Sequence, residues 1–184
     1  MELIFLRHGH TDWNEKGLLQ GTSDIPLNEK GRFGAVKAKE VLSQWVFDAV
    51  YCSPLLRARQ TLEIAYPQGV PLLDSRIAEW NFGVLEGMCV ADNDRYQRLW
   101  YPDALPIECA ERLEDVISRV KEFYDEVSDT YVDGRILVVS HGGVSAALQC
   151  SMYGFPEGES ARQYILPNCT PVLFRNGQAP WVLR

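Results

Sequence analysis

Two of the three histidines in the chain follow closely after short apolar runs. His8 comes after the run Leu3–Leu6, and His141 comes after the run Ile136–Val139. In an open parallel sheet, ligands bind at the carboxyl ends of the strands. One histidine at such a position is more often a structural hydrogen-bonding residue, but each of these two is followed by a glycine, which lets a backbone or a ligand approach closely. Together the two histidines favour a functional site.

Two arginines accompany the histidines and favour an anionic ligand. Arg7 directly precedes His8, and Arg57 follows the apolar run Ala49–Cys52. The residues between that run and Arg57 place the arginine in the first turn of a helix, where free backbone amides and the helix dipole attract anions. A guanidinium group binds phosphate through two parallel hydrogen bonds. The sequence therefore predicts a phosphate site at one edge of a sheet.

Short apolar runs separated by amphipathic helices predict an α/β fold with a mostly parallel sheet between two layers of helices. The expected strands are Leu3–Leu6, Ala49–Cys52, Val70–Leu73 and Ile136–Val139. A terminal antiparallel hairpin is also expected, because Asn176-Gly177 is a turn pair suited to positive φ and is flanked by the apolar runs Pro171–Arg175 and Trp181–Leu183.

Three helices follow from the spacing of apolar residues and from their capping signals. The first follows Asn28 and places Ala35, Ala38, Val41, Leu42 and Trp45 on one face. The second is expected to begin with Ser53 as N-cap and Pro54 in its first turn, and to end near Ala65. The third is expected from Glu111 to Ser128, with a packing role and an apolar face made of Leu113, Val116, Ile117, Val120, Tyr124 and Val127.

Composition narrows the class of protein. A chain of 184 residues, 46% of them apolar, predicts one domain over residues 1–184 with a sizeable core. A net charge of -7 argues against nucleic acid or an acidic membrane as partner. No apolar run is long enough to span a bilayer. The five scattered cysteines lack a C-x-x-C pair, so we expect reduced thiols in a cytoplasmic protein rather than disulfides or zinc.

The segment Leu6-Arg7-His8-Gly9-His10-Thr11, followed by Asn14, resembles the signature of the histidine phosphatase superfamily. The resemblance covers nearly the whole chain, because further segments agree with the family in order and spacing. They are Gln20-Gly21 with Asp24, Pro26-Leu27 and Gly31, Ser53 to Ala58 with Gln60-Thr61, Glu79 with Phe82-Gly83 and Glu86-Gly87, Val139 to Gly143, and Asn168-Cys169.

This resemblance implies a phosphoglycerate mutase-like three-layer sandwich and a phosphatase that hydrolyses a small-molecule phosphate monoester through a phosphohistidine, with neither metal nor cofactor. The implied catalytic residues are the nucleophile His8, the proton donor Glu79, and His141, Arg7 and Arg57 around the phosphate. The implied substrate-binding residues are Thr11, Asn14, Gln20, Gly21 and Gly142. The chemistry agrees, because a neutral imidazole can attack phosphorus and fixed cations can neutralise the phosphoryl oxygens.

Two departures from the family pattern concern the substrate. The usual Gly-Gly-Glu-Ser before the long helix is here Cys109-Ala110-Glu111-Arg112, and we assign its acid no catalytic role. The segment from Trp80 to Ala110 lacks the long insertion and the arginine pair of the cofactor-dependent mutases, which favours hydrolysis over mutase action. Within it, Arg95 and Arg98 are expected on a solvated helix face, and Tyr96 and Trp100 are expected to pack.

Three alternatives stay open at this point. The runner-up is a phosphoglycerate mutase, and among phosphatases the sequence resembles both α-ribazole phosphatases and broad-specificity enzymes. A metalloprotein is a second class, because His8, His10 and His141 include an H-x-H pair that can ligate an ion. A catalytically inactive binding module is the third, although such proteins usually lose a nucleophile or an arginine and this chain retains both. The sequence does not indicate an oligomeric state.

Overall fold

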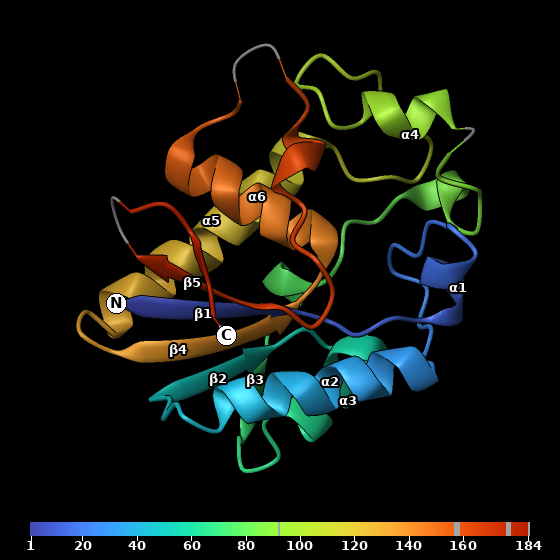
Figure 1. The fold of residues 1–184 in the computed structure, drawn as a ribbon. Helices are drawn as coiled ribbons and strands as arrows, with labels where there is room; N and C mark the ends of the chain where they lie inside the picture. Colours follow the sequence, from blue (N-terminus) through green and yellow to red (C-terminus); the bar gives the residue numbers. More distant parts are fainter. Residues whose placement is uncertain (92, 157–158, 176–177, 184) are drawn as a thin grey trace.

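The computed structural model describes residues 1–91, 93–156, 159–175 and 178–183. This part of the chain forms a three-layer sandwich in which a six-stranded sheet lies between two layers of helices (Figure 1). The strands are β1 Glu2–Arg7, β2 Ala49–Cys52, β3 Pro71–Leu73, β4 Arg135–Ser140, β5 Pro171–Arg175 and β6 Trp181–Val182. The helices are α1 Asp12–Glu15, α2 Glu29–Leu42, α3 Leu56–Ala65, α4 Asp94–Arg98, α5 Leu113–Thr130 and α6 Gly142–Tyr153, with 3-10 helices η1 Ser75–Ile77, η2 Gly83–Leu85 and η3 Ala161–Tyr164.

The sheet has the strand order β3-β2-β4-β1-β5-β6. The first four strands in this order run parallel, and the last two are antiparallel to their neighbours. The four strands expected from the apolar runs are confirmed, each within one residue of its predicted ends. The antiparallel edge is also confirmed, while the Asn176-Gly177 turn lies outside the described residues.

Both faces of the sheet are covered, which is why its central strands read as nearly continuous apolar runs. On β1, Leu3 and Phe5 pack towards α5 and α6, whereas Ile4 and Leu6 pack towards α2 and α3. Figure 1 shows α2 and α3 below the sheet and α5 and α6 above it. Two separate hydrophobic cores therefore hold the ends of β1 and β4 in place.

The helices on the lower face differ from their predicted bounds. Helix α2 follows Asn28 as expected, and the Asn28 side chain caps it by accepting a hydrogen bond from Gly31 N at 2.9 Å, but the helix ends at Leu42 and leaves Trp45 outside it. The prediction that Ser53 caps the next helix is wrong, because α3 begins only at Leu56 and has no side-chain cap. Ser53 contacts a histidine instead, as described below.

The helices on the upper face include one that the sequence analysis does not predict. Helix α5 lies two residues further along than expected at each end, and Phe123 belongs to its buried face. Helix α6 was missed because residues 142–150 are all buried, so no polar face marks the helical period. None of the helices in the described residues combines the length and apolar character needed to cross a membrane.

The loop after β1 rests on the first turn of α2 through two glycines. A Cβ atom on Gly31 would lie 2.1 Å from the carbonyl oxygen of His10, and one on Gly9 would lie 2.5 Å from the carbonyl oxygen of Gly31. The two backbones touch directly, and neither partner is a side chain that can move aside. This contact sets the path of the chain immediately after His8.

We predict that Gly31→Ala destabilises the protein by about 2 kcal/mol, because the new methyl group overlaps backbone atoms. Urea unfolding measures the change in the free energy of unfolding. The matched control is Gly34→Ala in the same helix, where the new Cβ would lie 3.2 Å from the Cys169 side chain, which can yield. The control should lose less than about 1 kcal/mol, since alanine also favours the helix. Equal losses in the two variants would contradict the backbone contact.

Candidate active site

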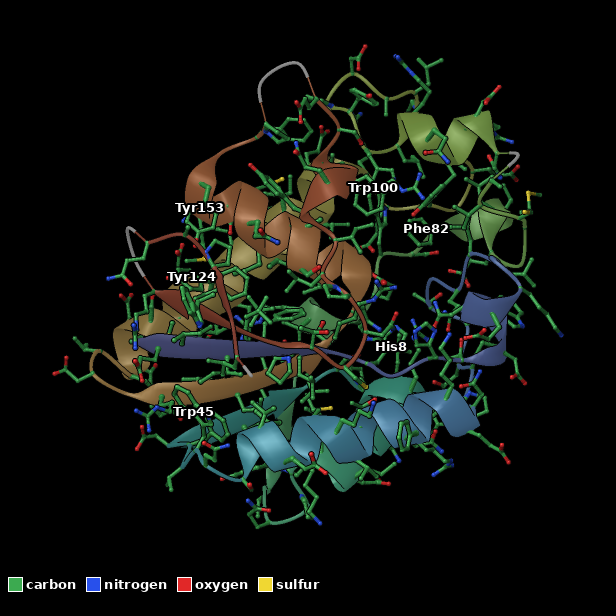
Figure 2. The ribbon with its side chains drawn as sticks, viewed as in Figure 1. His8, Trp45, Phe82, Trp100, Tyr124 and Tyr153 are labelled. Carbon is green, nitrogen blue, oxygen red and sulfur yellow. The ribbon has the colours of Figure 1, made fainter. Side chains whose placement is uncertain are left out.

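The two histidines that follow β1 and β4 meet at the carboxyl edge of the sheet, as the sequence predicts. The ring centroids of His8 and His141 are 5.2 Å apart. Both residues are buried, with exposed fractions of 2% and 0%. Figure 2 shows His8 at the end of β1, where the chain leaves the sheet.

The backbone of His8 is held from two sides. Its N–H donates to the carbonyl oxygen of Ser140 at 2.9 Å, which continues the pairing of β1 with β4. Its carbonyl oxygen accepts a hydrogen bond from Asn168 Nδ2 at 2.7 Å. The ring therefore projects from a backbone that β4 and the loop before β5 keep in position.

The ring of His8 has a defined tautomer. Its Nδ1 atom lies 2.7 Å from the carbonyl oxygen of Gly9, which can only accept, so Nδ1 carries the proton and Nε2 keeps its lone pair. Burial holds the pKa of His8 well below its usual range, and the positive charges of Arg57 and Arg7 act in the same direction. The imidazole is therefore neutral at neutral pH, with an available lone pair.

His141 presents a ring nitrogen without a partner. Its Nε2 atom lies 2.6 Å from Ser53 Oγ. Its Nδ1 atom is buried and has no hydrogen-bond partner among the described residues. Burial, followed by the charge of Arg57, also holds the pKa of His141 well below its usual range. If the Ser53 hydroxyl donates to Nε2, Nδ1 carries a proton that is available to an acceptor.

Arg57 lies fully buried beside the histidines, and one nitrogen of its guanidinium group has no hydrogen-bond partner among the described residues. Nη1 donates to the carbonyl oxygen of Ser23 at 2.9 Å, and Nη2 donates to that of Gly21 at 2.7 Å. The Nε atom has no hydrogen-bond partner within the described chain. Burial lowers the pKa of Arg57 to about 10, so the group remains a cation at neutral pH. The remaining donors are suited to an anion.

The loop that orients Arg57 is tied down by Glu86, a residue for which the sequence indicates no role. Its carboxylate accepts hydrogen bonds from Thr22 N at 2.8 Å and Thr22 Oγ1 at 3.0 Å. It also accepts from Ser23 N at 2.9 Å and Ser23 Oγ at 2.6 Å. Glu86 thus positions the carbonyl groups to which Arg57 donates.

Arg7 approaches the start of α6. Its Nη1 donates to the carbonyl oxygen of Leu166 at 2.8 Å, while its buried Nε has no partner in the described part of the chain. A Cβ on Gly142 would lie 3.2 Å from Arg7 Cζ, so glycine lets the guanidinium lie against the first turn of the helix. Burial lowers the pKa of Arg7, and the negative charge of Glu79 opposes that effect.

Glu79 lies against the same helix terminus. Its Oε1 atom accepts hydrogen bonds from Trp80 N at 2.9 Å and from Gly143 N at 3.0 Å. A Cβ on Gly143 would lie 2.5 Å from that oxygen, so a side chain there would displace the carboxylate. Ser140 Oγ donates to the carbonyl oxygen of Ile77 at 2.7 Å, which ties the segment leading to Glu79 to the end of β4.

The predicted polar residues after His8 divide into two groups. Asn14, Gln20 and Gly21 line a cleft in front of His8. Thr11 does not line the cleft, because it caps α1 and its hydroxyl donates to Gln20 Oε1 at 2.9 Å. Thr11 thus holds Gln20, and a direct contact between Thr11 and a phosphate stays a prediction.

The cleft encloses about 470 Å³ of empty space, part of it open to solvent. Of the predicted site residues, it is lined by Arg7, His8, Asn14, Gln20, Gly21, Glu79 and Gly142. The other lining residues are Leu18, Leu19, Phe82, Val90, Tyr96, Trp100, Gly143 and Ile165. Packing roles were predicted for Tyr96 and Trp100, and both are indeed buried, but they also form part of the cleft wall.

Three further positioning residues, besides Glu86, were not identified from the sequence as part of the site. Ser53 contacts His141, and Asn168 holds the backbone of His8. Thr61 Oγ1 accepts a hydrogen bond from Gly9 N at 2.9 Å and donates to the carbonyl oxygen of Arg57 at 2.7 Å. The contacts of Ser53 with His141, of Asn168 with His8 and of Thr61 with Gly9 each join distant parts of the chain, so only the family motif marks these residues before the fold is known.

The geometry gives no support to a site in which the three histidines share a metal ion. His10 Nδ1 lies 3.2 Å from Glu15 Oε1, yet burial and the positive charge of Lys30 lower the pKa of His10. Across the described ranges, no three histidine, cysteine, aspartate or glutamate side chains are grouped so as to hold a metal ion.

Comparison with known proteins places this geometry in one family. A model of the histidine phosphatase superfamily (branch 1) matches residues 3–184. Phosphoserine phosphatase 1 of Hydrogenobacter thermophilus is 33% identical over 162 residues, covering 84% of this chain and 77% of that protein. A 2,3-bisphosphoglycerate-dependent phosphoglycerate mutase of Cytophaga hutchinsonii is 35% identical over 160 residues, covering 79% of this chain and 74% of that protein.

A solved structure agrees over the full length. The crystal structure of phosphoglycerate mutase from Thermus thermophilus matches with a TM-score of 0.79 and 29% identity, covering 100% of this chain and 98% of that one. This agreement extends to the three-layer sandwich and its mixed sheet. The chain belongs to the histidine phosphatase superfamily, branch 1.

Proposed function

We propose that this protein is a phosphatase that hydrolyses a small-molecule phosphate monoester through a phosphohistidine formed on His8. One observation carries the proposal. The neutral His8 ring, with its lone pair on Nε2, lies among buried donors that lack partners within the described residues: Arg7 Nε, Arg57 Nε and His141 Nδ1. Buried polar groups are normally hydrogen-bonded, so such a cluster is suited to an anion that supplies the missing acceptors.

In the proposed reaction, His8 Nε2 attacks phosphorus and the bond to the leaving oxygen breaks. Arg7, Arg57 and His141 donate to the three non-bridging oxygens, where charge is distributed in the transition state. Because these donors are already oriented and removed from water, little reorganisation accompanies the step. Water then attacks the phosphohistidine and releases inorganic phosphate. Splitting the hydrolysis in this way replaces one difficult step with two easier ones.

We assign the proton transfers to Glu79, which lines the cleft beside His8. In the first step its carboxyl group gives a proton to the departing alkoxide. In the second step its carboxylate takes a proton from the attacking water. Gly143 N and Trp80 N keep this carboxyl in position.

The finer assignments are also proposals. We favour hydrolysis over mutase action because the segment from Trp80 to Ala110 is short, although a relative carries the name of a phosphoglycerate mutase. A broad-specificity phosphatase and an α-ribazole phosphatase are the two candidate classes. We further propose one domain over residues 1–184 and a cytoplasmic location, which the five cysteines support, since all are described and none forms a disulfide.

The phosphohistidine is the most direct test. Brief reaction with p-nitrophenyl phosphate labelled on phosphorus, in the presence of EDTA and quenched in base, should leave label on His8. His8→Ala should carry no label and lose at least about a thousandfold in kcat, as removal of a nucleophile does elsewhere. The matched control His10→Ala should label normally, because His10 contacts Glu15. Hydrolysis by His8→Ala at the unmodified rate would refute the assignment.

Replacing Arg57 with lysine keeps the charge but removes the planar fork. Two hydrogen bonds to the loop carbonyls and the unused Nε donor are lost together. We expect kcat/KM to fall by about a hundredfold or more, the effect of misplacing or removing one oriented donor. Arg59→Lys, an exposed position in the same helix, should stay within about twofold. An unchanged kcat/KM for Arg57→Lys would place the guanidinium outside the reaction.

Glu79→Gln tests the proton-donor role, because the amide is nearly isosteric but cannot transfer a proton. The rate on alkyl phosphates should fall by roughly a hundredfold or more, the range of general acid catalysis. On p-nitrophenyl phosphate, whose phenolate leaves readily without a proton, phosphorylation should be affected much less.

The comparison must use the burst of p-nitrophenolate and the corresponding single-turnover release of alcohol. Slow breakdown of the phosphohistidine would otherwise mask the difference, since the same carboxylate then acts as base. Equal losses on alkyl and aryl esters in this first turnover would remove Glu79 from the proton-donor role.

A further inference from the structure

The cleft has a second wall that takes no part in the proposed phosphoryl chemistry. It lines the same cleft as His8 and consists of hydrophobic and aromatic side chains. Figure 2 labels two of them, Phe82 and Trp100, above His8 in the segments that cross over the end of the sheet. The side chains used in the argument are those of Leu18, Phe82, Val90, Tyr96, Trp100 and Ile165.

The aromatic part of this wall is tightly packed. The Trp80 ring contacts Phe82 and Trp100, with centroids 5.3 and 5.1 Å away. The Tyr96 ring contacts the same two side chains, with centroids 5.5 and 5.9 Å away. None of these four residues is more than 6% exposed. A wall packed in this way cannot readily rearrange to admit water or an ion around a substrate.

Among the described residues, the cleft lining offers no additional charged side chain that could pair with an ionised leaving group. Apart from Tyr96, its ionisable side chains are Arg7, His8 and Glu79, all of which belong to the proposed phosphoryl chemistry. The Tyr96 phenol stays neutral, because burial raises its pKa to about 12. A carboxylate on the leaving group would therefore have no cation to pair with besides those that bind the phosphate. An ammonium group would have no carboxylate to pair with besides Glu79.

One arginine lies close to this wall but does not line the cleft. Arg162 is exposed, lies with its Cζ 5.6 Å from the centroid of the Tyr96 ring, and donates to Gln97 Oε1 at 2.6 Å. It is absent from the cleft lining. Arg162 thus helps to hold the wall in place from outside: its charge acts on the Tyr96 hydroxyl, but its side chain does not enter the cleft lining.

The polar atoms of the wall are neutral. Trp100 Nε1 is buried and forms no hydrogen bond with any described residue. It is near enough to the Tyr96 hydroxyl to affect the pKa of that group. Such groups can hydrogen-bond a hydroxyl, ether or carbonyl oxygen, but they do not offset the loss of hydration of a buried ion.

We infer that this site selects phosphate monoesters of neutral, largely apolar alcohols and discriminates against leaving groups that carry a carboxylate or an ammonium group. The inference rests on the proposed phosphatase function and adds its substrate class. It sets the chain apart from the relatives whose names specify phosphoserine or phosphoglycerate. The phosphate-binding residues contact the phosphoryl group, which all monoesters share. The wall determines which alcohol portion of the ester can bind in the cleft.

The test compares kcat/KM within matched pairs of substrates. The first pair is 3-phosphoglycerate and its methyl ester, which differ in one charge, and the second is O-phosphoserine and propyl phosphate. We expect the neutral member of each pair to be hydrolysed with a kcat/KM at least about tenfold higher, because only the charged member loses hydration without a partner. Equal values or a preference for the charged member would overturn the inference.

A variant tests the wall itself. Val90→Arg adds a cation at a half-buried position of the cleft lining, and should raise kcat/KM for 3-phosphoglycerate relative to its methyl ester at least about tenfold. The matched control is Val84→Arg, an exposed position outside the lining, which should leave that ratio unchanged. A similar change in both variants would show that overall charge, and not the wall, sets the preference.

The labelling of His8 separates the two possible failures. If no ester labels His8, the proposed function fails and the substrate class fails with it. If p-nitrophenyl phosphate labels His8 and the charged esters are nevertheless preferred, the phosphatase stands and only the substrate class is overturned.

Discussion

The organisation of this molecule depends on two arginines that lack a carboxylate partner: Arg57, which is fully buried, and Arg7, which is half-buried with its Nε atom out of contact with solvent. Neither Arg7 nor Arg57 forms an ion pair in the described part of the chain. Removing a guanidinium from water is costly unless other groups replace its hydration. Here backbone carbonyl groups replace part of it, and the Nε atoms remain without partners. The fold thus keeps positive charge ready for an anion, at a cost that the two hydrophobic cores must offset.

That requirement explains features that otherwise look unrelated. Carbonyl groups must be aimed at each guanidinium, so Glu86 binds the loop that faces Arg57. The start of α6 must come close to Arg7 and to Glu79, and at both points glycine is the residue that leaves room. Burial of the same cluster keeps the histidine rings neutral, which leaves His8 with the lone pair that a nucleophile needs.

The sequence predicts those parts of the fold and of the site that depend on residues close together in the chain. Apolar runs mark the strands, and the residues that follow them mark the sheet edge where His8 and His141 meet. Helix α6 was missed because periodicity carries no signal when every side of a helix is buried. Ser53 reads locally as a helix cap, yet its hydroxyl binds a histidine 88 residues away. Contacts of this kind exist only once the sheet has brought distant strand ends together.

Tyr96 and Trp100 show that one side chain can have both a packing role and a role in the binding site. Both were expected to pack, and both do, but their packing also builds the wall that a leaving group must contact. The residues proposed for phosphoryl transfer follow the strand ends, whereas most of this wall comes from the segment that crosses above them. Substitutions of the wall residues in this segment, with Glu86 left in place, can therefore change the accepted alcohol without disturbing the phosphate site. Relatives with 33% and 35% identity can share the chemistry and still differ in substrate, because the two properties reside in different parts of the chain.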